Sequence, residues 1–155
     1  MDEPEWVMEK RNKALEKYRE LEWPNLRYGT TIRADYSGLN TTKLAFGNGI
    51  VESHLEHDEA IVLPLMEAVK KYPELVKPYL FDYFEIKHKF HALHAAHWRN
   101  GLFIYIPPHA EIEKPIIIDR KVLSNSIHHL LVVCGEGSTA AVIEKHSSAG
   151  EQQIF

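Results

Sequence analysis

The chain has 155 residues, 45% of them hydrophobic, and a formal net charge of -4 at pH 7. This length and apolar content predict one folded domain with a real core, and they exclude disorder over most of the chain. Lys and Arg residues are interleaved with Asp and Glu residues, so the sequence offers no basic face for the phosphates of a nucleic acid.

Three further features of the sequence indicate where in the cell the protein works. The longest apolar runs, such as Leu102 to Ile106, fall far below the roughly 20 residues that a membrane span needs. The chain starts Met-Asp-Glu-Pro-Glu, which is acidic where a signal peptide is basic and then apolar. Cys134 is the single cysteine, which excludes an internal disulfide and an all-thiolate metal or cluster site within one chain. We therefore expect a cytoplasmic protein that does not enter the membrane.

Residues 1–100 are predicted to form a mainly helical region with a short irregular or extended linker. Pro4 suits the first turn of a helix, and this helix should stop before Pro24. Residues 25–52, in which four glycines separate short apolar runs, are expected to form the linker, with brief strands.

More helices are expected later in this region. One runs from about Asp58 to Tyr72, with Pro64 delaying its start or kinking it, and Pro73 then opens a shorter helix through Leu80. Another runs from about Ile86 to Trp98. The pair Asn100-Gly101 should end that helix, because both residues tolerate left-handed backbone angles.

Residues 101–155 change in character to short β-branched and aromatic runs. Turns separate these runs, notably Gly135-Glu136-Gly137. The fold class is therefore α+β, with helices first and strands after, and periodicity alone leaves a sandwich, a barrel and a solenoid open. The expected strands are Leu102–Ile106, Pro115–Ile118, His128–Val133 and Thr139–Glu144.

The ten histidines raise the question of a metal site. Four of them recur at every third position of residues 88–97, and a three-residue step falls roughly 60° short of a helical turn. An adjacent pair such as His91 and His94 could share a metal, but the four could not converge, and no glutamate base lies between the pair. We interpret these histidines as structural and predict no metal site. The candidates that would hold one are His54, His57, His91, His94 and His146.

Several stretches carry a family resemblance when they are taken together in chain order. They are Glu3–Trp6 with Lys10–Leu15, Tyr72–Val76, Lys89–Pro107 continuing into Glu113–Ile116, and Leu130–Glu144. In this order, over nearly the whole chain, they resemble the SufB/SufD family, the scaffold subunits of the SUF iron-sulfur cluster assembly machine. The resemblance covers the N-terminal portion of that family.

The resemblance implies a fold for the β part. Family cores are right-handed β-helices, solenoids of short strands in which each rung needs neighbours to bury its face. Residues 101–155 would be the first rungs of such a core. Complete members are longer and carry further rungs and a part that binds SufC, the ATPase of the machine. The chain is therefore expected to be a truncated or a naturally short form, and its open solenoid end predicts self-association.

The resemblance also separates two branches of the family. In SufB proteins the strand matching Val142 to Glu144 runs on into Glu-Gly-Cys, whose cysteine is implicated in receiving sulfur. This chain has Glu144-Lys145-His146 there, so it lacks that thiolate and resembles SufD. Cys134 lies in an apolar strand, where we expect a buried structural thiol. His94 stands where family members commonly have asparagine, which favours helix packing or capping over metal binding.

The function that this resemblance implies is a non-enzymatic, SufD-like scaffold that acts through protein contacts. A SufB-type subunit and SufC are the implied partners, no cofactor resides in the chain, and an iron-sulfur cluster is expected only in the full complex. The sequence has neither a phosphate-binding glycine loop nor a G-x-S-x-G nucleophile elbow, as a scaffold allows. Two alternatives stay open: a small β-rich metalloenzyme with histidine ligands, and a degenerate paralogue that only makes interactions.

Overall fold

The computed structural model describes residues 3–24, 26–28, 32–34, 50–54, 58–83 and 85–148. Backbone contacts group the chain into two units, one drawn from residues 1–45 and 84–97 and the other from residues 46–83 and 98–155. Each unit therefore combines stretches that are distant in the sequence. The division at residue 100 into a helical and a β region stays a prediction.

The first unit contains two helices that pack on each other, α1 (Glu5–Glu20) and α4 (Lys89–His97). Pro4 precedes α1 as its N-cap residue, and Leu21 follows its end, so the predicted helix is confirmed. The buried residues of both helices are small or apolar, including Val7 and Ala14 of α1. Two short antiparallel strands, β1 (Leu26–Tyr28) and β2 (Ile32–Ala34), also belong to this unit. They agree with the brief strands expected in the linker, whose other residues up to 49 lie outside the described ranges.

The second unit holds the remaining elements. Its two helices are short: α2 (Leu65–Lys71) and α3 (Pro73–Val76). Its strands are β3 (Ile50–His54), β4 (Ile61–Pro64), β5 (Asn100–Ile106), β6 (Ile116–Val122), β7 (His128–Cys134) and β8 (Val142–Ser148). With helices in both units and strands dominating the second, the α+β class is confirmed.

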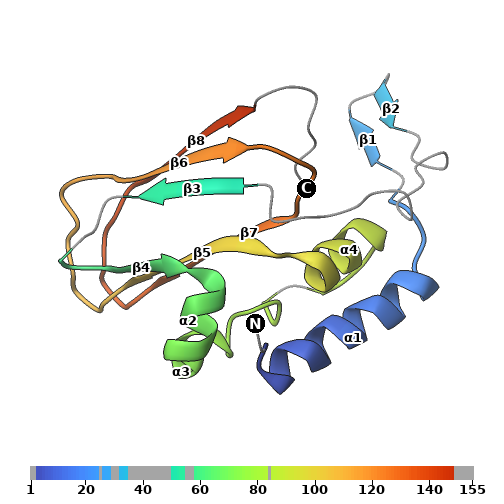
Figure 1. Cartoon of the computed structure of the whole chain (residues 1–155), viewed down its shortest axis with the longest axis horizontal. Helices are drawn as coiled ribbons and strands as arrows, with labels where there is room; N and C mark the ends of the chain where they lie inside the picture. The colour runs from blue at the N-terminus through green and yellow to red at the C-terminus, as the bar shows by residue number, and fades with distance from the viewer. Residues whose placement is uncertain are drawn as a thin grey trace. The chain divides into compact units, whose positions relative to one another are not determined.

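From β5 onward the chain alternates between two three-stranded sheets, ordered β3-β6-β8 and β4-β5-β7. Strand β7 lies parallel to β5, and each pair of facing residues is 28 positions apart, as Asn100 and His128 are. Strand β8 lies parallel to β6, and its pairs are 26 positions apart, as Ile116 and Val142 are. One pass through both sheets is thus followed by a second pass stacked beside it (Figure 1).

The turns between the sheets stack in the same way. Outside the strands, Glu111 and Thr139 form a parallel bridge. The backbone N–H of Ile112 donates to the Thr139 carbonyl at 2.8 Å, and the N–H of Thr139 donates to the Ala110 carbonyl at 2.9 Å. The parallel backbone pairing therefore continues through the turn, so that successive passes are hydrogen-bonded there as well as in the sheets.

The core of the second unit is aliphatic. Alternate residues of a strand point to one face, and on β5 and β6 this alternation turns large apolar side chains inward. Each fully buried side chain of this kind contributes roughly 1.5–3 kcal/mol to folding. The buried cluster consists of Leu102, Ile104, Ile106, Ile112, Ile116 and Ile118.

Strands β3 and β4 run against the direction of the two passes. Strand β3 is antiparallel to β6, and β4 is antiparallel to β5. The helix predicted over Asp58 to Tyr72 is therefore wrong in its first half, where Ile61 pairs with Tyr105 of β5. Pro64 is the last residue of β4 and the N-cap of α2, so the proline delays the helix as the sequence allowed.

The predicted role of Asn100-Gly101 as the end of the helix over Ile86 to Trp98 is wrong. Helix α4 ends at His97, and Asn100 and Gly101 open β5. Glycine is needed at position 101 because a Cβ there would overlap the backbone carbonyl oxygen of His129 on the neighbouring strand. Gly101 thus allows the two strands to approach closely. Among the glycines that the structure describes, the one with a left-handed backbone is Gly137, with φ 67° in the predicted turn.

Other boundaries shift by a few residues. The helix that starts at Pro73 ends at Val76, before the predicted Leu80. Strand β6 extends past Ile118 to Val122, and β8 starts at Val142, after the predicted Thr139. The additional residues of β6 and β8 pair with each other, which a reading of single-strand propensity could not detect.

Candidate functional site

A polar cluster formed by β6 and β8 is the candidate functional site. Arg120 of β6 forms an ion pair with Glu144 of β8, with Nη1 to Oε1 at 2.9 Å. The same Nη1 lies 3.2 Å from Nε2 of His146, and that nitrogen lies 3.8 Å from Oε2 of Glu144. The three side chains therefore form one connected polar network.

Strand register explains how the cluster forms. Arg120 faces His146 directly in the parallel pair, and Ile118 faces Glu144. Because alternate residues share a face, Arg120 lies in the same row as Ile116 and Ile118, which are fully buried in the core. A cation therefore occupies an inward-facing position that aliphatic residues fill earlier in the strand.

Burial differs sharply across the cluster. The side chain of Arg120 is 2% exposed, that of Glu144 is 32% exposed and that of His146 is 42% exposed. A buried guanidinium is tolerated only when it is paired and hydrogen-bonded, so Glu144 supplies the charge that offsets the desolvation of Arg120. The carboxylate and the imidazole keep access to solvent.

Donor chemistry assigns the state of His146. An arginine has donors and no acceptor, so Nε2 of His146 must accept the hydrogen bond from Arg120. This hydrogen bond requires the tautomer that carries its proton on Nδ1. A metal at Nε2 would compete with Arg120 for the same lone pair, so the arrangement suits a fixed hydrogen-bond network better than a ligand set.

The structure places His91 and His94 three positions apart on α4. The ring of His91 lies against that of His88, with centroids 3.7 Å apart, and its Nδ1 accepts the backbone N–H of Lys87 at 3.5 Å. The buried face of α4 consists of Ala92, Leu93, Ala95 and Ala96, so His91 and His94 lie beside that face and are partly exposed.

The remaining histidine candidates cannot be placed as ligands. The side chain of His54 and the whole of His57 lie outside the described residues. Within the described ranges, no three side chains of His, Cys, Asp or Glu come close enough together to hold a metal ion. The statement that the five candidate histidines bind no metal stays a prediction.

The prediction for Cys134 is wrong. Its side chain is exposed, although it belongs to an apolar strand. Cys134 faces the fully buried Ile106 in the parallel pair, but β7 is the edge strand of its sheet. An inward row on an edge strand has a neighbour on one side only, which leaves such side chains accessible.

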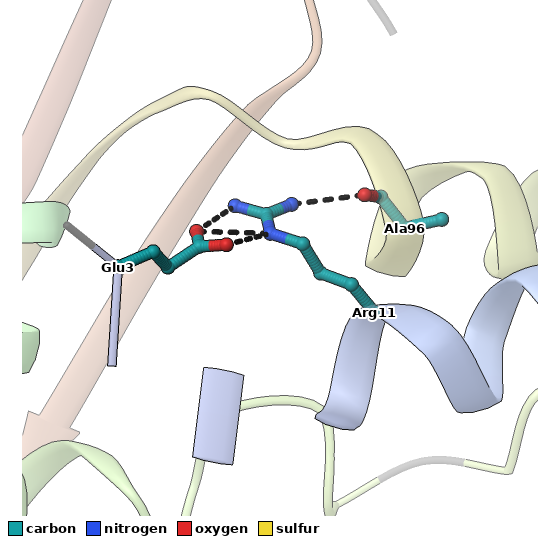
Figure 2. Close-up of polar contacts among 3 residues, drawn as sticks. All are labelled: Glu3, Arg11 and Ala96. Atoms are coloured by element: carbon teal, nitrogen blue, oxygen red, sulfur yellow. Dashed lines mark hydrogen bonds and ion pairs between the residues drawn. The ribbon is translucent and has the colours of Figure 1, made fainter. Parts of the chain in front are cut away.

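Sequence reasoning missed a second polar arrangement, which lies in the first unit. The guanidinium of Arg11 binds the Glu3 carboxylate through Nε at 2.9 Å and Nη2 at 2.8 Å, and its Nη1 donates to the Ala96 carbonyl at 2.9 Å (Figure 2). Arg11 thus ties the segment before α1 and the last turn of α4 to one side chain. Its positive charge also suits the carbonyl end of α4. The spacing of Glu3 and Arg11 offered no recognised motif from which to predict this contact.

The described residues contain no helix with the length and apolar composition that crossing a bilayer requires. This finding agrees with the short apolar runs of the sequence.

Comparisons with known proteins identify the family. A family model described as the SufBD protein N-terminal region matches residues 25–118. An iron-sulfur cluster assembly SufBD family protein of Pyrococcus horikoshii is 29% identical over 99 residues, which are 56% of this chain and 22% of that protein. A protein of the same description from Mycobacterium tuberculosis is 27% identical over 105 residues, 65% of this chain and 12% of that protein.

A third relative is the iron-sulfur cluster assembly protein SufD of Bacillus subtilis, which is 27% identical over 103 residues, 63% of this chain and 24% of SufD. The match thus spans less than a quarter of the length of each of these three relatives. The family model covers more than half of this chain, from the linker to the third residue of β6. The chain belongs to the SufB/SufD family and represents its N-terminal region.

Proposed function

We propose that this chain serves iron-sulfur cluster assembly as part of a SufD-like scaffold that acts through protein contacts. The observation that carries the proposal is the family match over residues 25–118, together with relatives whose names assign them to that process. In this proposal the cluster is the cargo of the assembled complex, and the chain itself holds no resident cofactor and performs no catalysis. The cytoplasm is the proposed compartment.

The strand order supports a β-helix as the structural basis of the scaffold. Two passes through two sheets, with strands 28 and 26 positions apart, are the pattern of stacked solenoid rungs. Parallel strands joined by a crossover in one sheet are almost always right-handed, so we propose a right-handed coil. The antiparallel strands β3 and β4 would then cover the first side of the β5–β6 rung.

The other side of the stack supports the proposed contacts. Strands β7 and β8 are edge strands of their sheets, and Val132 and Ile143 on them are exposed. Edges of this kind accept further strands by backbone pairing. We propose that they receive additional rungs or a second copy of the chain, and light scattering that shows a stable monomer would argue against self-association.

The site on β8 supports the SufD-like branch. The segment Glu144-Lys145-His146 carries an imidazole where SufB proteins are expected to carry a cysteine, and Nε2 of that imidazole accepts a hydrogen bond from Arg120. An imidazole in this position cannot take up sulfur as a persulfide, because it lacks a thiolate. Sulfur acceptance would therefore fall to a SufB-type partner, with the SufC ATPase as the other proposed component.

Loss of the gene tests the proposal in cells. Cells without it should lose activity of a [4Fe–4S] enzyme such as aconitase while a dehydrogenase without a cluster keeps its activity. Complementation with the wild-type gene should restore aconitase. Unchanged aconitase activity under iron limitation would contradict a role in cluster assembly and would favour a paralogue that only makes interactions.

A further inference from the structure

The side chains of two histidines accept hydrogen bonds from backbone N–H groups at the start of α4. His88 directly precedes this helix, and its carbonyl accepts the N–H of Ala92 at 3.2 Å, which is the first bond of the helical turn. Nδ1 of His88 also accepts the N–H of His91 at 3.4 Å. A side-chain acceptor that binds the N–H three residues ahead is the geometry of an N-cap, a position usually taken by Ser, Thr, Asp or Asn.

His91 completes the arrangement in the opposite direction. Its Nδ1 accepts the backbone N–H of Lys87 at 3.5 Å, so each imidazole binds a backbone donor near the other. A capping box has the same reciprocal form, except that its third helical residue, normally Glu or Gln, binds the N–H of the N-cap residue itself, whereas His91 binds the N–H one position earlier. The rings of His88 and His91 lie 3.7 Å apart between centroids, tilted by 37°.

Both bonds depend on protonation. An imidazole that accepts through Nδ1 must carry its single proton on Nε2, and a protonated ring has two donors and no acceptor. We propose that His88 and His91 form a paired cap that holds the first turn of α4 only while both imidazoles are neutral, so that acidification loosens the start of this helix. A second charge on the neighbouring ring would add repulsion at the positive end of the helix dipole.

The surroundings of the pair favour the neutral state. Burial lowers the pKa of His88 from its ordinary value of 6.5, the neighbouring His91 lowers it further, and a backbone hydrogen bond opposes the change. The charged side chains on the same segment are Glu85 and Lys87, 3.8 Å apart, and Lys89. Toward α1, Nζ of Lys89 donates to the Tyr18 carbonyl at 2.8 Å and lies 4.8 Å from the Tyr18 ring, and the Lys89 N–H donates to the Glu22 carbonyl.

The sign of the pH effect follows from the lowered pKa. As pH falls, the unfolded chain binds the proton before the folded chain does, so stability decreases in that interval. The contribution of His88 is complete above its ordinary pKa of 6.5 and is lost as pH falls through the lower pKa of the folded state. The opposite end of α4 is held by Arg11 on the Ala96 carbonyl, and a guanidinium stays charged throughout. The effect should therefore be confined to the first turn.

Amide hydrogen exchange, expressed as protection relative to the intrinsic rate at each pH, tests the cap on the full 155-residue chain. Between about pH 7.5 and pH 5.5, protection at His91 and Ala92 should fall by about fivefold, the size of a lost N-cap, while protection at Ala96 should hold. The double variant His88→Asn with His91→Gln keeps both acceptors without titrating, so it should fold and show no such fall.

A control variant on the same helix is His94→Gln, which should keep the wild-type pH response. If the double variant lost protection with acid as the wild type does, the histidines would not be the cap and the proposal would be overturned. Equal protection of the wild type at both pH values would overturn it as well. If both capping substitutions prevented folding, His91→Gln alone should still reduce the fall at Ala92, and an unreduced fall would count against the paired cap.

Discussion

Nη1 of the buried Arg120 donates a hydrogen bond to Nε2 of His146, 3.2 Å away on the neighbouring parallel strand. The same nitrogen forms an ion pair with Glu144 at 2.9 Å. One guanidinium on the buried face of β6 thus contacts two residues of β8. The contact fixes the β6–β8 register by chemistry as well as by backbone pairing, because a shift by one residue would turn Arg120 away from both partners.

Replacing Arg120 with Met should therefore destabilise the chain. The change removes the cation and leaves Glu144 without its partner, and since that carboxylate keeps some access to water we expect a loss of about 2 kcal/mol, below the range for fully buried pairs. Urea unfolding measures this loss. Lys121→Met, at the next position and exposed on the opposite face, is the matched control and should change the free energy of unfolding little. Equal effects of the two substitutions would mean that the network contributes no stability.

Arg11 should be sensitive to a substitution that keeps its charge. Arg11→Lys loses the paired donors to the Glu3 carboxylate and the reach to the Ala96 carbonyl, because an ammonium cannot bind both in the planar geometry of Figure 2. We expect a loss of about 1 kcal/mol by thermal or urea unfolding. The exposed Lys13 on the same helix provides the control, Lys13→Ala, with a change near zero. A lysine variant as stable as wild type would show that the contact is dispensable.

Alanine substitutions at two glycines of the second unit should differ in their cost to stability, according to the atoms around each glycine. Gly101→Ala places a Cβ against the carbonyl of His129, and backbone cannot move aside without breaking the β5–β7 ladder, so we expect a loss of 2 kcal/mol or more, roughly the upper part of the overpacking range. At Gly137 a Cβ meets the His109 side chain at 2.9 Å, which can rotate, and the cost is mainly that of φ 67°. Gly137→Ala should cost about 1 kcal/mol. The reverse order in a denaturation series would contradict the register of β5 and β7.

Metal content separates the scaffold from the metalloenzyme alternative. Protein purified without oxygen and without metal-affinity resin should contain far less than one iron, zinc or acid-labile sulfide per chain, because Nδ1 of His91 and Nε2 of His146 already accept hydrogen bonds. Elemental analysis and sulfide determination provide the measurement. Near-stoichiometric metal that disappears in the double variant His91→Ala with His94→Ala would make α4 a metal site and would refute this expectation.

Local signals were sufficient for some elements. The helix α1 followed from Pro4 and the apolar spacing after it, and β5 and β7 followed from dense β-branched runs that stop at Pro107 and Gly135. These features act within a few residues of one another, so sequence reasoning can detect them. The same reasoning misjudged Ile61–Pro64, because apolar residues just before a helix fit both the helical stripe and a short strand.

The features that depend on distant residues could not be predicted in this way. The parallel pairing of β7 with β5 joins residues 28 positions apart. Because of this pairing, position 101 needs glycine, and Cys134 is exposed on the outer strand of the pair. The burial of Arg120 likewise depends on Glu144, 24 positions later. Propensity carries no information on which strands pair, so these consequences of pairing could not be predicted from the strand-like runs alone.

Affinity purification of the tagged chain from the cells that produce it, under anaerobic conditions and with an untagged lysate as control, tests the proposed scaffold role most directly. We expect mass spectrometry to find a SufB-type subunit enriched with the chain, in an assembly that depends on protein contacts and survives metal chelation. A chain that purifies free of every component of the SUF machine would contradict that role.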